Sequence, residues 1–547
     1  MKIRKNIFVF LSILVLAGGI FIRFWHLDVI PPGVHYDEAF NGIDALKSLE
    51  SGNFRFFYPE NYGREGLHIN VIAFFIKIFG NTNFGLRFAN ALWGSLTLLG
   101  FYFLLREFKF SSLSVLAGTF MLAFSFWHLV FSRTAYRAIM VPLILVWMFY
   151  FFWKAVNNPK KKAIWILLAG IFLGLGFHTY ISFRIAPLVF ALVAASFLLG
   201  KEKLWKNYKK YLAFSILGVV LVSLPIILYY SGHFKDFISR SEAVSIFNAP
   251  KGMGVGEALG KSVVSHLSAF FVFGDKNPRH NYNNQPLLPA AWAVLFFIGS
   301  VISLGEIAKT LSKFIKYKRK INPDFAASPW FHISVLGQSI FWLMLVPGFL
   351  SIEGIPHSLR IIGAIPGVFV LSVLPLEYII GHYGESKKTG GKFPSSNNFL
   401  VIFASLLFFM IIGGVTQVYT YFFEWPKNLS VLGAYERKLY DFGMLVKELP
   451  VGKNNYITVA YNTWIKDTKK ESSMKTTEYI AWPKIKDYEF VRPLEGKDSI
   501  NCDGTQVVFL ESDQWLRDQY KIRCPDLSQQ KYTYDNGKYV FWVMKSK

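Results

Sequence analysis

The segment "NIFVFLSILVLAGGIFIRFW", residues 6–25, is almost wholly apolar and is long enough to cross a lipid bilayer as a helix. Backbone groups inside a bilayer find no water to bond, so a segment that spans it alone must be helical. Similar runs follow at about 84–105, 112–131, 138–154, 163–179, 184–200, 210–230, 287–306, 330–350, 360–380 and 398–422. The sequence therefore predicts an all-α polytopic membrane domain of about eleven spans.

Basic residues lie in alternate gaps between these runs. The chain of 547 residues is 53% hydrophobic and carries a formal net charge of +24. Much of that charge lies in "KAVNNPKKK" (154–162), "KEKLWKNYKK" (201–210) and "KTLSKFIKYKRK" (309–320), with "MKIRK" at the start. Cytoplasmic loops are enriched in Lys and Arg, so we expect these gaps and the N-terminus in the cytoplasm. The charge is then a topology signal, and we expect no nucleic-acid partner.

The predicted topology divides the chain into two domains. Residues 1–424 form the membrane domain, with two long outer segments at 26–83 and 231–286. From residue 425 onward, short runs rich in β-branched and aromatic residues ("NYITVAY", "QVVFL", "KYVFWVM") predict a small α/β domain, 425–547. An odd number of spans places this domain outside the cytoplasm. A composition rich in lysine and phenylalanine favours a prokaryotic plasma membrane.

The two cysteines both lie in the C-terminal domain, at Cys502 and Cys524. A disulfide is expected between them because an extracytoplasmic domain is in an oxidising compartment. Two free thiols are the alternative.

Acids and arginines gather in the segments expected outside. The stretch "PPGVHYDEAFNGIDAL" (31–46) places Asp37 and Glu38 just after the first span. A carboxylate at the membrane surface can deprotonate a hydroxyl, and the planar fork of arginine suits a phosphate held by two contacts. A substrate with a phosphate at the surface and a tail in the bilayer is a lipid phosphate. The candidate binding residues are Arg87, Arg133, Arg137, Tyr180, Arg184, Arg279, His357 and Arg360.

Structural roles compete with each of these assignments. Asp37 and Glu38 could instead stabilise a helix N-terminus. Glu65 could pair with its neighbour Arg64. The arginines that open spans, Arg360 among them, could simply extend toward the interface.

Several motifs in order resemble the C-type membrane glycosyltransferases (GT-C fold). "HYDEAFNGIDALKSLESGNF" (35–54) is followed by "GREGLHINVIAFFIKIFGNTNFGLRFANALWG" (63–94), then by "SRTAYRAIMVPL" (132–143) and "GFHTYISFRIAPL" (176–188). The resemblance is to the protein O-mannosyltransferases and the bacterial lipid A aminoarabinose transferase, and it covers about residues 1–380. These relatives carry an Asp-Glu pair, a later acid and an arginine that opens the second span, which match Asp37-Glu38, Glu65 and Arg87.

The resemblance implies an activity. Such enzymes move a sugar from a polyprenyl-monophosphate donor to a hydroxyl of an extracytoplasmic acceptor, with inversion at the anomeric carbon. The first acid of the pair, Asp37, would be the general base, with Glu38 beside it. In the aminoarabinose relative, an acid and a later histidine bind a divalent metal. The matching residues are Glu65 and His280, although "EGL" at 65–67 departs from the relative's "EKP" and no cofactor is certain.

Two other functions remain open. An oligosaccharyltransferase or glycan ligase would use a diphosphate-linked donor and often a metal held by several acids, in which the outer segments here are poor. A transporter or flippase for a lipid-linked sugar would typically show two related halves and polar residues at mid-membrane. The candidate residues here instead collect at one face.

Overall fold

The computed structural model describes residues 1–547 except 1–4, 200–201, 249–252, 320–326, 390–395, 459–473, 495 and 547. Its contacts divide the chain into two compact units. Unit 1 comprises Met1–Trp25, Arg55–His68 and Phe88–Trp425, and unit 2 comprises His26–Phe54, Ile69–Arg87 and Pro426–Lys547. Two segments of the expected outer loop 26–83 therefore pack in the same unit as the C-terminal residues.

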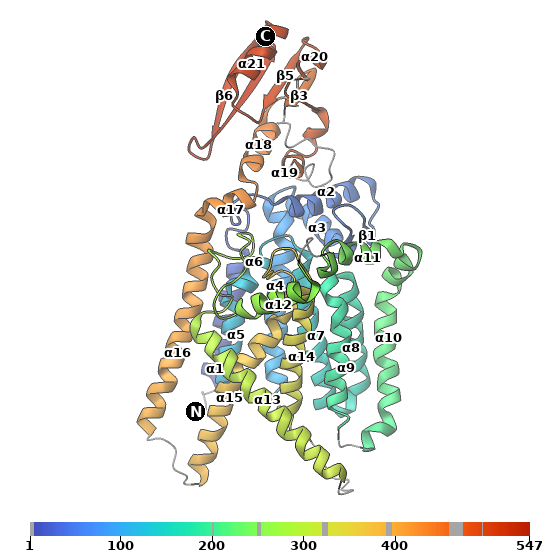
Figure 1. Ribbon diagram of the computed structural model, residues 1–547, viewed down its shortest axis with the longest axis vertical. Helices are drawn as coiled ribbons and strands as arrows, with labels where there is room; N and C mark the ends of the chain where they lie inside the picture. Colours follow the sequence, from blue (N-terminus) through green and yellow to red (C-terminus); the bar gives the residue numbers. More distant parts are fainter. Residues whose placement is uncertain are drawn as a thin grey trace. The chain divides into compact units, whose positions relative to one another are not determined.

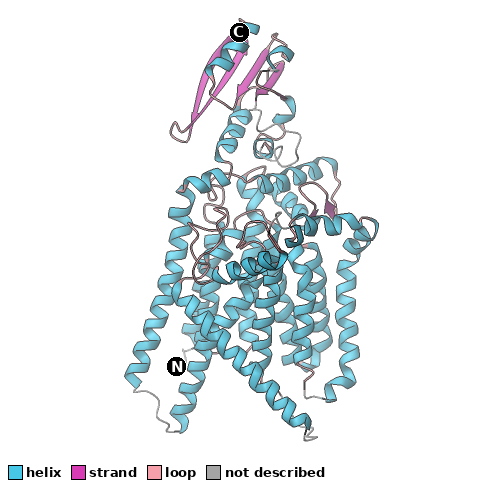
Figure 2. Ribbon diagram, in the orientation of Figure 1, coloured by secondary structure: helices cyan, strands magenta, loops and turns pink. Residues whose placement is uncertain are grey.

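Helices make up nearly all of unit 1 (Figures 1 and 2). A two-stranded antiparallel ribbon, β1 (Phe57–Tyr58) and β2 (Arg64–Glu65), is its only named sheet among the described residues. The helices are α1 (Lys5–Phe24), α4 (Asn83–Glu107), α5 (Ser112–Phe124), α6 (Phe126–Phe131), α7 (Met140–Asn157), α8 (Lys162–Leu175), α9 (Ala186–Ser196), α10 (Glu202–Gly232), α11 (Phe234–Ala243), α12 (Val255–Ser268), α13 (Ala290–Arg319), α14 (Pro329–Phe349), α15 (Ile365–Thr389) and α16 (Ser396–Tyr419). Helix α4 has its first five residues in unit 2.

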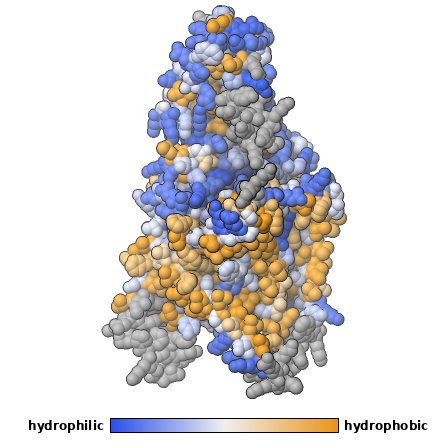
Figure 3. Space-filling model, viewed as in Figure 1, coloured by the Kyte–Doolittle hydropathy of each residue, from blue (hydrophilic) through white to orange (hydrophobic). Residues whose placement is uncertain are grey.

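Nine helices of the described residues are long and apolar enough to cross a membrane. They cover Lys5–Phe24, Asn83–Glu107, Arg137–Asn157, Pro159–His178, Tyr208–Gly232, Ala290–Lys316, Pro329–Phe349, Ile362–Gly381 and Ala404–Lys427. Hydrophobic residues cover much of the visible surface of these helices (Figure 3), as lipid-facing helices require. The predicted helical membrane domain is confirmed, and nine of its expected spans are continuous helices.

The two other expected spans are shorter in the structure than the sequence predicted. The run 184–200 becomes a 3-10 turn, Ile181–Ile185, followed by the eleven-residue helix α9. The run 112–131 is divided at Ser125, whose extended backbone (φ −70°, ψ 125°) ends α5 before α6 begins. Hydropathy averages over such a break, so the hydropathy pattern alone does not reveal it.

Side chains satisfy the backbone groups that the break at Ser125 releases. Arg23 Nη1 donates to the carbonyl of Ala123 (3.2 Å), and the amide of Phe126 donates to Gln417 Oε1 (3.0 Å). Backbone groups at membrane depth must find partners within the protein, because hydrocarbon supplies none. Arg23 and Gln417 therefore make this interruption possible.

Unit 2 contains a five-stranded mixed sheet and several helices, which confirms the predicted small α/β domain. The sheet order is β4-β3-β5-β7-β6, with β3 parallel to β4 and β5, and with β7 antiparallel to β5 and β6. The elements are α2 (Tyr36–Ser51), most of α3 (Gly66–Phe79), α17 (Leu429–Ala434), α18 (Arg437–Glu448), β3 (Asn454–Thr458), α19 (Lys475–Ile480), β4 (Glu489–Val491), α20 (Gly496–Ser499), β5 (Thr505–Phe509), α21 (Gln514–Arg523), β6 (Leu527–Tyr534) and β7 (Tyr539–Ser546).

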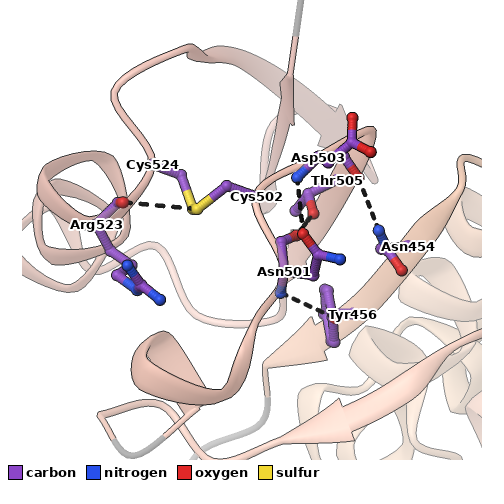
Figure 4. The surroundings of a disulfide bond; sticks show 8 residues. All are labelled: Asn454, Tyr456, Asn501, Cys502, Asp503, Thr505, Arg523 and Cys524. Atoms are coloured by element: carbon purple, nitrogen blue, oxygen red, sulfur yellow. Dashed lines mark hydrogen bonds between the residues drawn. A yellow bond between two sulfur atoms is a disulfide. The ribbon is translucent and has the colours of Figure 1, made fainter.

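A disulfide joins Cys502, before β5, to Cys524, after α21 (Figure 4). Cys524 is buried in the apolar core of the sheet with residues such as Val507, Leu516 and Tyr520. The amide of Asn501 donates to the hydroxyl of Tyr456 (3.1 Å), which ties the same loop to β3. The covalent link therefore fastens the end of α21 to the loop that leads into β5, the central strand of the sheet.

Glycines allow α8 and α10 to approach closely in the membrane domain. An alanine Cβ at Gly170 would lie 2.3 Å from the carbonyl oxygen of Ser215, and one at Gly174 would lie 2.6 Å from that of Val219. On α10, a Cβ at Gly218 would lie 2.4 Å from the carbonyl oxygen of Leu167. Small residues at such spacings let membrane helices pack backbone to backbone.

We predict that Gly170→Ala destabilises the membrane domain, because α8 and α10 must separate to admit the methyl group. Overpacking of this kind costs about 1–3 kcal/mol. Thermal unfolding of the detergent-solubilised protein measures the effect. Gly305→Ala on α13 is the control, since nothing lies within 4 Å of a Cβ there. Equal melting temperatures for the two variants would contradict the close approach.

Candidate functional site

Asp37 and Glu38 lie in the first turn of α2 but have different surroundings. His35 caps the helix: its Nδ1 accepts from the amide of Asp37 (3.1 Å), and its own amide donates to Glu38 Oε2 (3.2 Å). The Glu38 side chain is fully buried, whereas one third of the Asp37 side chain is exposed. The Asp37 carboxylate lies 3.5 Å from His35 Nδ1.

Arg87 engages Glu38 with two nitrogens. Its Nε donates to Oε1 (3.0 Å) and its Nη2 to Oε2 (3.2 Å), and neither side chain is exposed. The same guanidinium donates to the carbonyls of Pro31 (3.0 Å) and Gly33. Glu38 and Arg87 thus hold the chain that leads into α2, and in doing so they position Asp37.

Residues from the C-terminal part of the chain pack around this motif within unit 2. Thr476 Oγ1 donates to the carbonyl of Val34 (2.9 Å). The ring of Tyr479 packs so closely on Gly42 that a Cβ there would lie 2.3 Å from the ring. Gly33 has a positive φ (133°) and approaches the carbonyl of Tyr435 so closely that no side chain fits there. The surroundings of Asp37 are therefore built partly by residues 435–482.

A second cluster lies in unit 1 and joins residues that are far apart in the sequence. Arg137 Nε donates to Glu65 Oε2 at 2.6 Å, and both side chains are largely buried. The Arg137 guanidinium also lies over the ring of Tyr180, 5.3 Å from its centroid. The structure thus brings together Glu65, Arg137 and Tyr180.

Arg184 extends the cluster through aromatic rings. Its guanidinium stacks on Phe237 (3.8 Å to the centroid), lies 5.9 Å from the centroid of Tyr230, and donates to the carbonyl of Phe237 (2.7 Å). The Tyr230 hydroxyl is buried beside Arg184, and the charges of Glu65, Arg184 and Arg137 act on it. We call Glu65, Arg137, Tyr180, Arg184 and Tyr230 the arginine–tyrosine cluster.

Tyr230 was missed from the sequence because it lies at the end of a long apolar run. Arg137 and Arg184 contribute two guanidiniums to the cluster, and Glu65 contributes one carboxylate. Such a cluster can hold a dianionic phosphate, since arginine donors and a tyrosine hydroxyl all donate to phosphate oxygens.

Other predicted binding residues make different contacts. Arg133 is buried, donates to the carbonyl of Ile22 (2.7 Å) and to the hydroxyl of Tyr421 (3.2 Å), and so ties α1 to the turn after α16. Arg360 donates to Glu353 Oε2 (2.8 Å). Arg279 Nε donates to Asn277 Oδ1 (3.2 Å). The structure therefore gives these arginines packing or loop contacts.

His280 and His357 meet in a buried group with Asp275, which sequence analysis did not single out. His280 Nδ1 donates to Asp275 Oδ2 (3.0 Å), and the two imidazole centroids are 5.0 Å apart. Burial raises the pKa of Asp275, but the charge of His280 and its hydrogen bond outweigh this and hold that pKa below its ordinary value. Burial also holds the pKa of His357 well below its usual range, so this ring is neutral. The spacing of Asp275 and His280 in one short loop was the available signal.

The metal pair implied by the resemblance does not fit this arrangement. Among the described residues, the metal-capable group that contains His280 consists of Asp275, His280 and His357, and Glu65 is not part of it. The carboxylate of Glu65 is instead engaged by Arg137. We therefore assign no metal site to Glu65 and His280 together.

Comparisons with known proteins agree with the fold. Residues 67–229 match a family model described as dolichyl-phosphate-mannose-protein mannosyltransferase. The apo structure of ArnT from Cupriavidus metallidurans is similar with a TM-score of 0.52 and 13% identity, over 97% of each chain. The apo Archaeoglobus fulgidus oligosaccharyltransferase has a TM-score of 0.51 and 13% identity, over 98% of this chain and 74% of that one. No curated protein sequence matches the chain.

The helical membrane domain and these similarities define the class of protein. It is an integral multi-pass membrane protein with the C-type glycosyltransferase fold. The resemblance to the protein O-mannosyltransferases that the sequence motifs indicated is confirmed.

We predict that Glu38→Gln destabilises unit 2, because it leaves the charge of Arg87 buried without its partner. Breaking a buried pair in this way costs about 3–5 kcal/mol. Glu50→Gln on the same helix is the matched control, since the Glu50–Lys486 pair is about half exposed. An exposed pair contributes about 0–1 kcal/mol. Hydrogen exchange of α2 in the two variants provides the comparison, and equal protection would contradict the role of Glu38.

Proposed function

We propose that the protein is a membrane glycosyltransferase. It takes a sugar from a polyprenyl-monophosphate donor and transfers it to a hydroxyl of an acceptor outside the cytoplasm. The family match supports a monophosphate carrier, since dolichyl phosphate mannose is a sugar on a polyprenyl monophosphate. The observation that carries the proposal is the unequal acidic pair, in which buried Glu38 holds the chain and partly exposed Asp37 remains accessible.

The reaction is one displacement at the anomeric carbon. The acceptor oxygen attacks that carbon, its proton passes to the Asp37 carboxylate, and the bond between the anomeric carbon and the phosphate oxygen breaks. The carrier leaves as a polyprenyl monophosphate, and the configuration inverts. One base and one stabilised leaving group are enough for this chemistry.

Separately from the base, the arginine–tyrosine cluster of unit 1 is proposed, on its own contacts, as a binding site for the phosphate of a polyprenyl carrier. Arg137 and Arg184 are stacked on or beside aromatic rings, which keeps their guanidiniums in place. Fixed donors stabilise a developing charge without reorganising during the reaction. Aromatic rings at the same place can also pack against the faces of a sugar.

The proposed orientation has the N-terminus in the cytoplasm and the C-terminal domain outside, in a prokaryotic plasma membrane. The alternation of lysine-rich gaps supports it. An oligosaccharyltransferase with a diphosphate-linked donor is the second candidate, because the archaeal oligosaccharyltransferase shares the fold over nearly all of this chain.

We predict that Asp37→Asn lowers turnover by about 10²–10⁴-fold, because the amide cannot accept the acceptor proton. Transfer from labelled polyprenyl-monophosphate sugars in proteoliposomes measures it, beside Glu50→Gln as a surface-carboxylate control. Binding of the donor should not change. Transfer at the wild-type rate would remove Asp37 as the base, and transfer only from diphosphate-linked sugars would favour the second candidate.

We predict that Arg137→Lys, Arg184→Lys and Tyr230→Phe each weaken donor binding by about tenfold or more, because each loses a donor to phosphate while charge or shape is largely kept. Arg106→Lys is the control, since Arg106 contacts Tyr102 near the C-terminal end of α4.

Tyr230→Phe is the most informative of these variants. The change removes only the hydroxyl, so a structural hydrogen bond to Arg184 predicts a loss of stability of about 0.5–1.5 kcal/mol at most, with no effect on donor binding. Unchanged affinity for the polyprenyl phosphate in all three variants, measured by equilibrium binding in nanodiscs, would place the phosphate elsewhere.

A further inference from the structure

Three metal-ligating side chains converge in unit 1 from two separate loops. Asp275 and His280 belong to the segment between α12 and α13, and His357 belongs to the segment between α14 and α15. Each offers one ligand atom, these atoms all lie within 4.8 Å of one another, and all three residues are buried. The two loops therefore meet at these three side chains. Polar and charged side chains are rarely buried unless each has a partner for its polar atoms.

Neighbouring groups fix the carboxylate of Asp275. Its Oδ2 accepts from the amide and the hydroxyl of Ser358, both at 2.8 Å, and its Oδ1 accepts from the amide of Asn277 (2.8 Å). His280 donates to the same carboxylate. The 3.0 Å between His280 Nδ1 and Asp275 Oδ2 is close to the separation of two ligand atoms on one metal ion, so an ion can take the place of the proton between them.

His357 is held by its backbone while one side-chain nitrogen lacks a partner. Its amide donates to His266 Nε2 (3.1 Å). Its Nδ1 is buried and makes no hydrogen bond. A buried polar atom left without a partner is costly, so its presence requires an explanation. Coordination to a metal ion would satisfy this nitrogen.

We propose that Asp275, His280 and His357 form a binding site for a divalent first-row transition metal ion such as Zn²⁺. Two imidazoles and one carboxylate are ligands that zinc accepts. Ligand atoms around tetrahedral zinc lie about 3.3 Å apart, given bonds of about 2.0–2.1 Å. A small side-chain movement closes the group to that spacing. The ion cross-links the two loops that precede α13 and α15.

This ligand set differs from the pair that the sequence resemblance implied. Glu65 contributes nothing to it, because Arg137 occupies the Glu65 carboxylate. The proposal does not rest on the proposed glycosyl transfer, since it is argued from the three ligand atoms and from the unpaired His357 nitrogen. Metal content and transfer can therefore be measured separately.

The test is the zinc content of the full-length protein, purified in detergent without a polyhistidine tag and measured by mass spectrometry. We expect about one equivalent per chain after dialysis against zinc, and at least a tenfold loss in His357→Gln and Asp275→Asn. Glu65→Gln should keep its zinc. His332→Gln, which changes a buried histidine of α14 outside the group, is the control.

A second measurement covers variants that fail to fold. The metal-free wild-type protein should be stabilised against thermal unfolding by added Zn²⁺, because a ligand that binds only the folded state raises its stability. It should also give the visible absorption of tetrahedral Co²⁺. No bound zinc together with no thermal shift would overturn the proposal. Loss of zinc in Glu65→Gln with full retention in His357→Gln would overturn this ligand set.

Discussion

Glu38 and Arg87 form an ion pair in which both side chains are fully buried. The conformation of the acidic motif, Asp37 and Glu38, depends on this pair. A buried carboxylate and a buried guanidinium each carry a large desolvation penalty, which only close, multiple hydrogen bonds can offset. Arg87 meets that requirement with Glu38 and with two carbonyls, so it fixes the chain before α2 as well as the charge. Asp37, one residue earlier, is left partly exposed on a rigid helix start. The same contacts that stabilise the motif therefore separate the roles of its two acids.

In the membrane domain too, buried polar groups find hydrogen-bond partners within the protein. Where α5 stops short, Arg23 and Gln417 supply the bonds that a continuous helix would have made. Where α8 and α10 touch, glycines let the backbones meet and dispersion contacts replace the hydrophobic effect, which is weak between helices in lipid. Polar side chains inside this domain thus have identifiable structural duties. The Tyr230 hydroxyl, which lies beside Arg184 among the charges of the arginine–tyrosine cluster, is a candidate for binding.

Local patterns predicted some parts of the structure well. Among the residues that the structure describes, nine of the long apolar runs became long helices, and the β-branched runs near the C-terminus became β3, β5 and β7. In each case the information lies within a window of a few residues. The division at Ser125 was missed because Gln417, whose side chain bonds the amide of Phe126, lies 291 residues farther along the sequence. Tyr230 was missed because it ends a long apolar run, and Asp275 was missed although its spacing from His280 in one short loop was visible in the sequence.

The sequence by itself determined that this chain has many membrane-spanning helices and that a small α/β domain follows them. It also showed which motifs contain the acids and arginines. Hydropathy and charge decide these because they act on each segment independently of the others. Only the tertiary structure decided which acid of the pair is buried, since Arg87 reaches Glu38 across 49 residues. It also decided that His280 meets His357 and Asp275, with Ser358 bonded to Asp275 across 83 residues, while Glu65 pairs with Arg137. Such partners are chosen by packing, which brings distant side chains together and leaves no trace in the local pattern.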